Sequence, residues 1–242
     1  MPRTRVPAAP GIFQVGTAVA NVWLMVDGDG SRVLVDTGHR TERALLAAGL
    51  ARHGVRKPGD LDLVLLTHRH CDHAGNATWL RERFDCAVAC HAADRAALEG
   101  AVRPARLGGR GAPAVYDALA RIEDSFPART TVDHTFADGA VERGFEVIHV
   151  GGHTDGSVLL FHRASATLFT GDALITGPPV QRVVVRPRLA YRAFSDDASE
   201  CRANTVRYLR ARPRVARVCA GHGPMLTTDV DRHLSRLAPA AP

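Results

Sequence analysis

Short apolar runs separated by turn residues dominate the first part of the chain. Three such runs lie at residues 11–16, 21–26 and 32–37, and an Asp-Gly-Asp-Gly turn separates the second from the third. Asp-Gly between two apolar runs is a strong hairpin signal. The pattern therefore predicts three strands, of which the last two form a hairpin.

From residue 42 onwards, helical and extended patterns alternate. Helical spacing of apolar residues covers 42–51 and 76–83, on either side of the apolar run at 61–66. The later predicted elements are strands at 86–90, 145–150, 157–162, 167–172 and 215–221, and helices at 92–100, 114–124, 198–212 and 228–237. This alternation predicts a mixed α/β architecture.

In two stretches the apolar residues follow neither the helical nor the strand spacing. Residues 102–113 are rich in Gly, Pro and Arg, which is the composition of a lid, and residues 175–192 form a second irregular stretch. Together they contain seven arginines: Arg103, Arg106, Arg110, Arg182, Arg186, Arg188 and Arg192. We expect these two loops to form the walls of a substrate pocket.

Composition narrows the class of protein. The chain has 242 residues, 45% of them hydrophobic and 23% charged, which predicts one folded domain over residues 1–242. No signal peptide or membrane-spanning run is apparent, and the five cysteines form no CxxC pair, so we expect a cytoplasmic protein with reduced thiols and no membrane partner. The net charge of +6 suits an anionic substrate, but it also suits an ordinary basic surface.

The densest group of chemically active residues is the segment THRHCDHAGN at 67–76, directly after an apolar run. It brings His68, His70, Asp72 and His73 into one tight loop. Imidazole and carboxylate are ligands that suit zinc and other borderline divalent metals. The segment is therefore a candidate metal-binding loop.

Three later strand ends supply further candidate ligands. His153 lies in GGHTDG, Asp172 in FTGDAL and His222 in CAGHGP. Each has a glycine beside it, which lets the backbone pack closely around a site. Four separate strand ends with such residues predict a metal centre.

In this order and at this spacing, the four motifs resemble those of the metallo-β-lactamase superfamily, and residues 21–38 resemble that family's opening strands. The resemblance implies a four-layer αββα sandwich of two mixed β-sheets flanked by helices. It implies two divalent metal ions, with zinc as the first expectation and iron or manganese as alternatives. It also implies the ligand sets: His68, His70 and His153 for one metal, Asp72, His73 and His222 for the other, and Asp172 as the bridge.

Two carboxylates leave a pair of divalent cations with a net positive charge, which would lower the pKa of a bridging water. Asp72 is the predicted catalytic residue, because it can also orient this water and move its proton to the leaving group. Asp36, in VDTGH, is expected to accept a hydrogen bond from a ligand histidine or a loop amide.

Departures from known family patterns narrow the reaction. The commonest zinc β-lactamases have a cysteine where Asp172 stands, so the chain looks more like glyoxalase II, lactonases and phosphodiesterases. Glyoxalase II enzymes carry a Cys and a Lys shortly after the bridging aspartate, and neither is found here. Acyl-homoserine lactonases have a carbonyl-binding tyrosine at the position of Ile175, and Tyr191 is the candidate to replace it.

We therefore expect hydrolysis of a thioester or lactone by attack of a metal-bridging hydroxide. The expected substrate is a small-molecule or carrier-bound acyl compound, and Ile175, Arg182, Arg186 and Tyr191 are the candidate substrate-binding residues. A phosphodiesterase of the same fold and a mononuclear-iron sulfur dioxygenase remain alternatives. No segment interleaves basic and aromatic residues, so no nucleic-acid partner is expected. The sequence does not predict an oligomeric state.

Overall fold

Two mixed β-sheets form the centre of the molecule in the computed structural model, which describes residues 11–104, 107, 114–178 and 183–239. Within these residues, the first sheet has the spatial order β1 (Gly11–Gln14), β2 (Trp23–Val26), β3 (Arg32–Val35), β4 (Leu63–Leu65), β5 (Ala87–His91), β6 (His134–Phe136). β1, β2 and β3 pair antiparallel, and β3 to β6 pair parallel. The hairpin predicted between β2 and β3 is present.

The second sheet is also mixed. Its order is β13 (Arg217–Ala220), β10 (Thr167–Gly171), β9 (Val158–His162), β8 (Phe145–His149), β7 (Val141–Glu142). β13 is parallel to β10, whereas the other neighbours are antiparallel. A separate short ribbon pairs β11 (Leu174–Ile175) with β12 (Arg188–Leu189).

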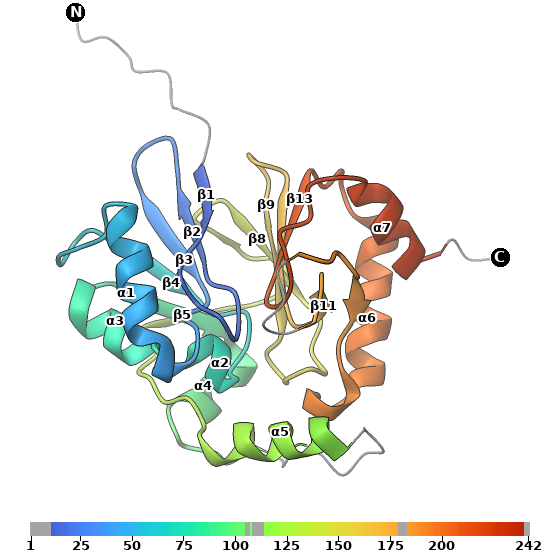
Figure 1. Ribbon diagram of the computed structural model, residues 1–242, viewed down its shortest axis with the longest axis horizontal. Helices are drawn as coiled ribbons and strands as arrows, with labels where there is room; N and C mark the ends of the chain where they lie inside the picture. Colours follow the sequence, from blue (N-terminus) through green and yellow to red (C-terminus); the bar gives the residue numbers. More distant parts are fainter. Residues whose placement is uncertain (1–10, 105–106, 108–113, 179–182, 240–242) are drawn as a thin grey trace, which may run out of the picture.

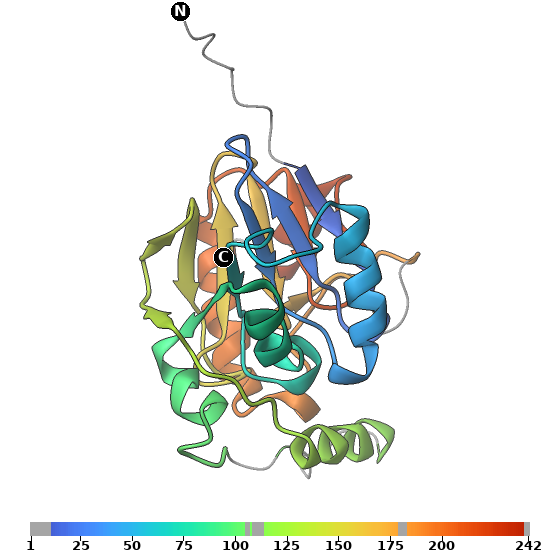
Figure 2. The same cartoon turned by 90° about the vertical axis from the view of Figure 1, so that its left-hand side faces the viewer.

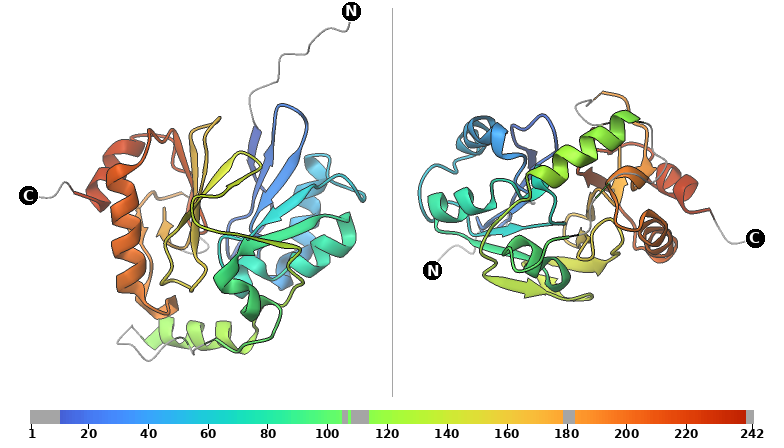
Figure 3. Two further views of the ribbon diagram at one scale, coloured as in Figure 1. Left: turned by 180° about the vertical axis from the view of Figure 1, so that it is seen from behind. Right: turned by 90° about the horizontal axis from the view of Figure 1, so that it is seen from below.

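Helices cover the outer faces of both sheets (Figure 1, Figure 2). On the first sheet lie α1 (Arg43–Arg52), α2 (Cys71–Ala74), α3 (Ala77–Phe84) and α4 (Ala92–Leu98), and on the second lie α6 (Ala198–Ala211) and α7 (Val230–Leu237). The helix α5 (Ala114–Ser125) crosses from one half of the molecule to the other at one edge of the sandwich (Figure 3). Two short 3-10 helices are η1 (Arg40–Glu42) and η2 (Arg192–Phe194). The predicted αββα sandwich is confirmed.

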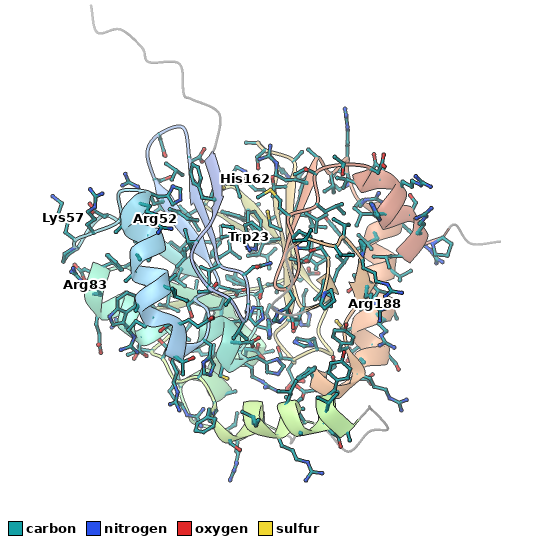
Figure 4. All side chains as sticks on the ribbon, viewed as in Figure 1. Trp23, Arg52, Lys57, Arg83, His162 and Arg188 are labelled. Atoms are coloured by element: carbon teal, nitrogen blue, oxygen red, sulfur yellow. The ribbon has the colours of Figure 1, made fainter. Side chains whose placement is uncertain are left out.

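Apolar side chains on both faces of the central strands hold the layers together. In β2, Trp23 (labelled in Figure 4) and Met25 join the core between the two sheets, and Leu24 joins the core beneath α1 and α3. In β9, Leu160 faces the other sheet, whereas Leu159 packs towards α6 and α7. Successive side chains of a strand point to opposite faces, so continuous apolar runs produce strands that are covered on both sides.

The strands and helices that the sequence failed to predict are short. β6, β7, β11, β12 and α2 have two to four residues each, too few to show a helical or strand spacing of apolar residues.

Most of the loop at 102–113 lies outside the described residues, so its role as a lid stays a prediction. The organisation of residues 1–242 as a single domain also stays a prediction. No helix in the described part of the chain is long and apolar enough to cross a bilayer.

Candidate metal centre

The seven predicted ligands come from four loops at one edge of the sandwich. His68 and His70 follow β4, and Asp72 and His73 lie in α2, which begins immediately after His70. The other three come from the second half of the molecule: His153 from the loop between β8 and β9, Asp172 directly after β10, and His222 shortly after β13. The five histidines are buried, and the two aspartates are partly exposed.

Three histidines form one half of the cluster. His68, His70 and His153 each place a ring nitrogen within 4.8 Å of the others. The Nε2 atoms of His68 and His153 are only 3.2 Å apart. We call these residues the three-histidine half.

Asp72, His73 and His222 form the other half, which we call the aspartate half. The Oδ2 atom of Asp72 is 3.3 Å from His222 Nε2 and 3.6 Å from His73 Nε2. The ligating atoms of these three residues also lie within 4.8 Å of one another.

Asp172 lies between the two halves. Its Oδ1 atom is 3.3 Å from His73 Nε2, and its Oδ2 atom is 3.3 Å from His222 Nε2. The same Oδ2 atom is 3.9 Å from Nε2 of His153, in the three-histidine half. This carboxylate therefore reaches both halves, as a bridging ligand must, although its ligand role stays a prediction.

The cluster fits divalent metal ions. The buried Nε2 atom of His70 has no hydrogen-bond partner, and His73 Nε2 and Asp172 Oδ1 face each other without an aligned hydrogen bond. A buried polar atom without a partner costs about 1–3 kcal/mol. Imidazole and carboxylate donors at these distances match the ligand preferences of zinc, iron and manganese.

The histidines of the two halves differ in their pKa values. Burial lowers the pKa of His68 and His70 well below the usual value and that of His153 to about 4, so these rings are neutral at pH 7. Burial also acts to lower the pKa of His222, but Asp172 and Asp72 outweigh it and raise the value to about 10. In the metal-free protein the aspartate half therefore holds protons, which a metal must displace.

Asp36 occupies the place expected of it, behind the aspartate half. Its Oδ2 atom is 2.8 Å from His73 Nδ1, and its Oδ1 atom accepts a hydrogen bond from the Thr67 amide at 2.8 Å. Asp36 therefore contacts both a candidate ligand and the loop that carries His68. Such partners fix the orientation of a ligating imidazole.

Three further histidines have hydrogen-bond partners that the sequence did not reveal. Nδ1 of His68 is 3.0 Å from Thr67 Oγ1, and Nδ1 of His153 is 3.0 Å from Ser195 Oγ. Nδ1 of His222 is 2.9 Å from the Val19 carbonyl. These contacts engage Nδ1 and leave Nε2 for the cluster. Thr67 could have been inferred from its place beside His68, but the other two partners are distant in sequence.

Two glycines allow the loops to meet. A Cβ atom on Gly221 would lie 2.5 Å from Cε1 of His73, and one on Gly171 would lie 2.5 Å from Thr67 Oγ1. Gly171 also has a φ of 46°, which side chains disfavour. Larger residues here would push the ligand loops apart.

The candidate substrate-binding residues are spread over the second irregular loop. Ile175 is buried in β11 and pairs with Arg188 of β12. Tyr191 precedes η2, and its carbonyl accepts a hydrogen bond at 2.7 Å from the hydroxyl of Ser195, the residue that contacts His153. Arg186 is exposed, and Arg182 lies outside the described residues. Their roles in substrate binding stay predictions.

Comparison with known proteins identifies the family. The model of the metallo-beta-lactamase superfamily matches residues 15–222. The chain therefore belongs to this superfamily, and it is a metallo-hydrolase by that membership.

Individual relatives agree with this assignment. The chain is 30% identical to an acyl-coenzyme A thioesterase, MBLAC2, of Gallus gallus, over 96% of this chain and 83% of that one. It is 31% identical to a hydroxyacylglutathione hydrolase of Stenotrophomonas maltophilia, over 64% of this chain but only 46% of the relative. The crystal structure of TTHA1623 in a di-iron-bound form covers 95% of this chain and 98% of its own, with a TM-score of 0.64 and 26% identity.

Proposed function

We propose that the protein hydrolyses a thioester of a small-molecule or carrier-bound acyl group. The observation that carries the proposal is Asp172, whose carboxylate reaches both halves of the candidate centre. Two relatives are named for thioester hydrolysis, one on acyl-coenzyme A and one on hydroxyacylglutathione. Hydrolysis of a lactone uses the same attack on an acyl carbon, and it is the second substrate class within this proposal.

The proposed cofactor is a pair of divalent ions, with zinc as the first expectation and iron next, since a structural neighbour is di-iron-bound. The three-histidine half would hold one ion, and the aspartate half would hold the other. Asp172 would contact both ions. Bound at such a centre, divalent cations polarise an acyl carbonyl and make water more acidic.

Asp72 is the residue that we assign to proton handling. Burial acts to raise its pKa, but His73 and His222 outweigh it and lower the value to about 2. Asp72 is therefore a carboxylate at neutral pH and can orient an attacking water by accepting its hydrogen bond. As the water attacks the acyl carbon, Asp72 can accept its proton and pass it to the thiolate that leaves when the C–S bond breaks.

Tyr191 and Arg188 are the proposed contacts for the substrate. Both come from the loop that follows Asp172, and the hydroxyl of Tyr191 can donate a hydrogen bond to an acyl oxygen. Arg188 supplies a cation beside it, which suits a substrate with a phosphate or carboxylate. Ile175, Arg182 and Arg186 remain predicted contacts.

The test combines metal analysis with a substrate screen. Protein purified without added metal is analysed for bound elements and then assayed on thioesters, lactones and phosphodiesters. Two divalent ions per chain with turnover of a thioester or lactone would support the proposal. Turnover confined to phosphodiesters would favour the phosphodiesterase alternative, and a single iron with oxygen consumption on a persulfide would favour the dioxygenase.

The substitution Asp172→Asn tests the bridging role. We expect kcat to fall at least about 100-fold with the fold intact, since Asn cannot supply the negative charge shared by both halves. Asp133→Asn is the matched control, because Asp133 is a surface carboxylate paired with Arg81 at 2.7 Å. Unchanged turnover in Asp172→Asn would contradict the assignment.

A further inference from the structure

Arg69 lies between two candidate ligands, His68 and His70, and its side chain is almost buried. Only 9% of the side chain is exposed. A buried guanidinium is costly unless it is paired and hydrogen-bonded. Arg69 has two carboxylate partners: Nη2 is 2.6 Å from Asp196 Oδ2, and Nε is 3.7 Å from Asp94 Oδ1.

Asp94 connects Arg69 to the loop of His153. It lies in the first turn of α4, and its side chain is 1% exposed. It accepts hydrogen bonds from Thr154 Oγ1 at 2.7 Å and from the Gly156 amide at 3.0 Å. Thr154 directly follows His153, so the carboxylate of Asp94 ties the two ligand loops together.

Asp196 makes a second connection to the same loop. Its backbone amide donates a hydrogen bond to the His153 carbonyl at 3.1 Å. The preceding residue, Ser195, places its hydroxyl 3.0 Å from Nδ1 of His153. Both partners of Arg69 therefore hold the segment that carries His153.

We propose that Arg69 is a positioning residue for the three-histidine half of the metal centre. Through Asp94 and Asp196, its guanidinium fixes the loop of His68 and His70 against the loop of His153. The aspartate half has a different support, because Asp36 holds His73. Loss of Arg69 therefore weakens one metal site and spares the other.

This inference rests on the proposed metal centre, so the experiment first measures wild-type binding. Metal-free protein is titrated with Zn²⁺ against a chelator, and with Co²⁺ by visible absorption. His153→Gln and His222→Gln identify which binding step belongs to each half. A wild-type protein that binds no pair of metals would overturn the proposed function, and this inference with it.

The decisive variant is Arg69→Met, which keeps the length of the side chain and removes the guanidinium. We expect the step that His153→Gln abolishes to weaken by about 10–100-fold, the usual effect of removing an outer partner of a metal ligand. For the binding step that His222→Gln abolishes, the metal affinity should change by less than about threefold. Arg69→Lys should restore part of the lost metal affinity, since it keeps the positive charge but not the planar, forked set of guanidinium N–H donors.

Two further variants complete the design. Arg81→Met removes an exposed arginine that is paired with Asp133 at 2.7 Å, and it should leave both steps unchanged. Asp196→Asn should weaken the same step as Arg69→Met, and it replaces that variant if Arg69→Met does not fold, because Asp196 is 18% exposed. Equal weakening of both steps, or no weakening in a folded variant, would overturn the inference.

Discussion

Asp36 occupies a backbone conformation that few side chains tolerate. It follows β3 with a φ of 62°, and there its carboxylate contacts both His73 and Thr67. Asn and Asp populate this left-handed region more readily than other residues that carry a Cβ atom. The position therefore requires two properties at once: tolerance of positive φ and a negative charge behind the candidate metal centre.

The substitution Asp36→Asn separates these properties. Asn keeps the backbone conformation but not the charge, so we expect affinity for the metal of the aspartate half to fall by about 10–100-fold while the fold persists. Metal retention after dialysis, together with circular dichroism, measures both effects. Asp85→Asn is the control, because Asp85 is exposed and also has a positive φ, 53°. Full metal retention in Asp36→Asn would refute the expectation.

At the scale of elements, α5 is joined to the site by aromatic rings. The ring of Tyr116 stacks on that of Tyr191 at 5.6 Å and meets the ring of Phe194 edge-on at 6.3 Å. Figure 1 shows α5 along the lower edge of the sandwich, next to η2. Aromatic pairs contribute about 0.5–1.5 kcal/mol beyond the area that they bury. Tyr116 therefore holds Tyr191 in place beside the cluster.

Tyr116→Ala should raise KM for the turned-over acyl substrate by up to about tenfold, with kcat changed by less than about twofold. The reason is that the stacking of Tyr116 orders Tyr191, a proposed substrate contact, and Tyr116 is not one of the candidate metal ligands. Steady-state kinetics measures both constants. Val115→Ala is the control on the same helix, since Val115 is 62% exposed. A fall in kcat with unchanged KM would place Tyr116 in the chemical step instead.

The whole molecule should show the pH dependence of its buried histidines. The pKa values of His68, His70 and His153 are lowered by burial, the last to about 4, whereas an unfolded chain binds these protons near pH 6.5. The unfolded state thus binds more protons than the folded state between about pH 6.5 and 4, and stability falls as pH falls through that window.

Denaturant unfolding of the metal-free protein at a series of pH values measures this slope. Each pKa unit corresponds to about 1.4 kcal/mol, so a loss of several kcal/mol is expected from pH 6.5 to 4. His153→Gln should make the slope shallower, because two of the three histidines remain, and His233→Gln, on the partly exposed surface of α7, is the control. His222 acts in the opposite sense, because its pKa is raised to about 10 in the folded state. Its contribution to stability is present below pH 6.5 and is lost as pH rises towards 10. A flat profile below pH 6.5 would show that these rings are protonated in the folded state.

Alternating apolar runs and helical patterns predicted the mixed α/β class, and the four motifs, through the family that they resemble, predicted the αββα sandwich and the residues of the candidate centre. Continuous apolar runs predict strands that are covered on both faces, and a candidate ligand such as His68 or Asp172 is recognisable because it follows shortly after such a run. Local patterns of this kind need no knowledge of distant contacts.

Which side chains support the candidate centre depends on how the folded chain packs. Arg69 meets Asp94, and His153 meets Ser195, across separations of 25 and 42 residues. Strands as short as β11 and β12 exist because packing places them together and not because they have a period of their own. Contacts of this kind depend on how the two sheets and their loops pack together. A local sequence pattern does not contain that information.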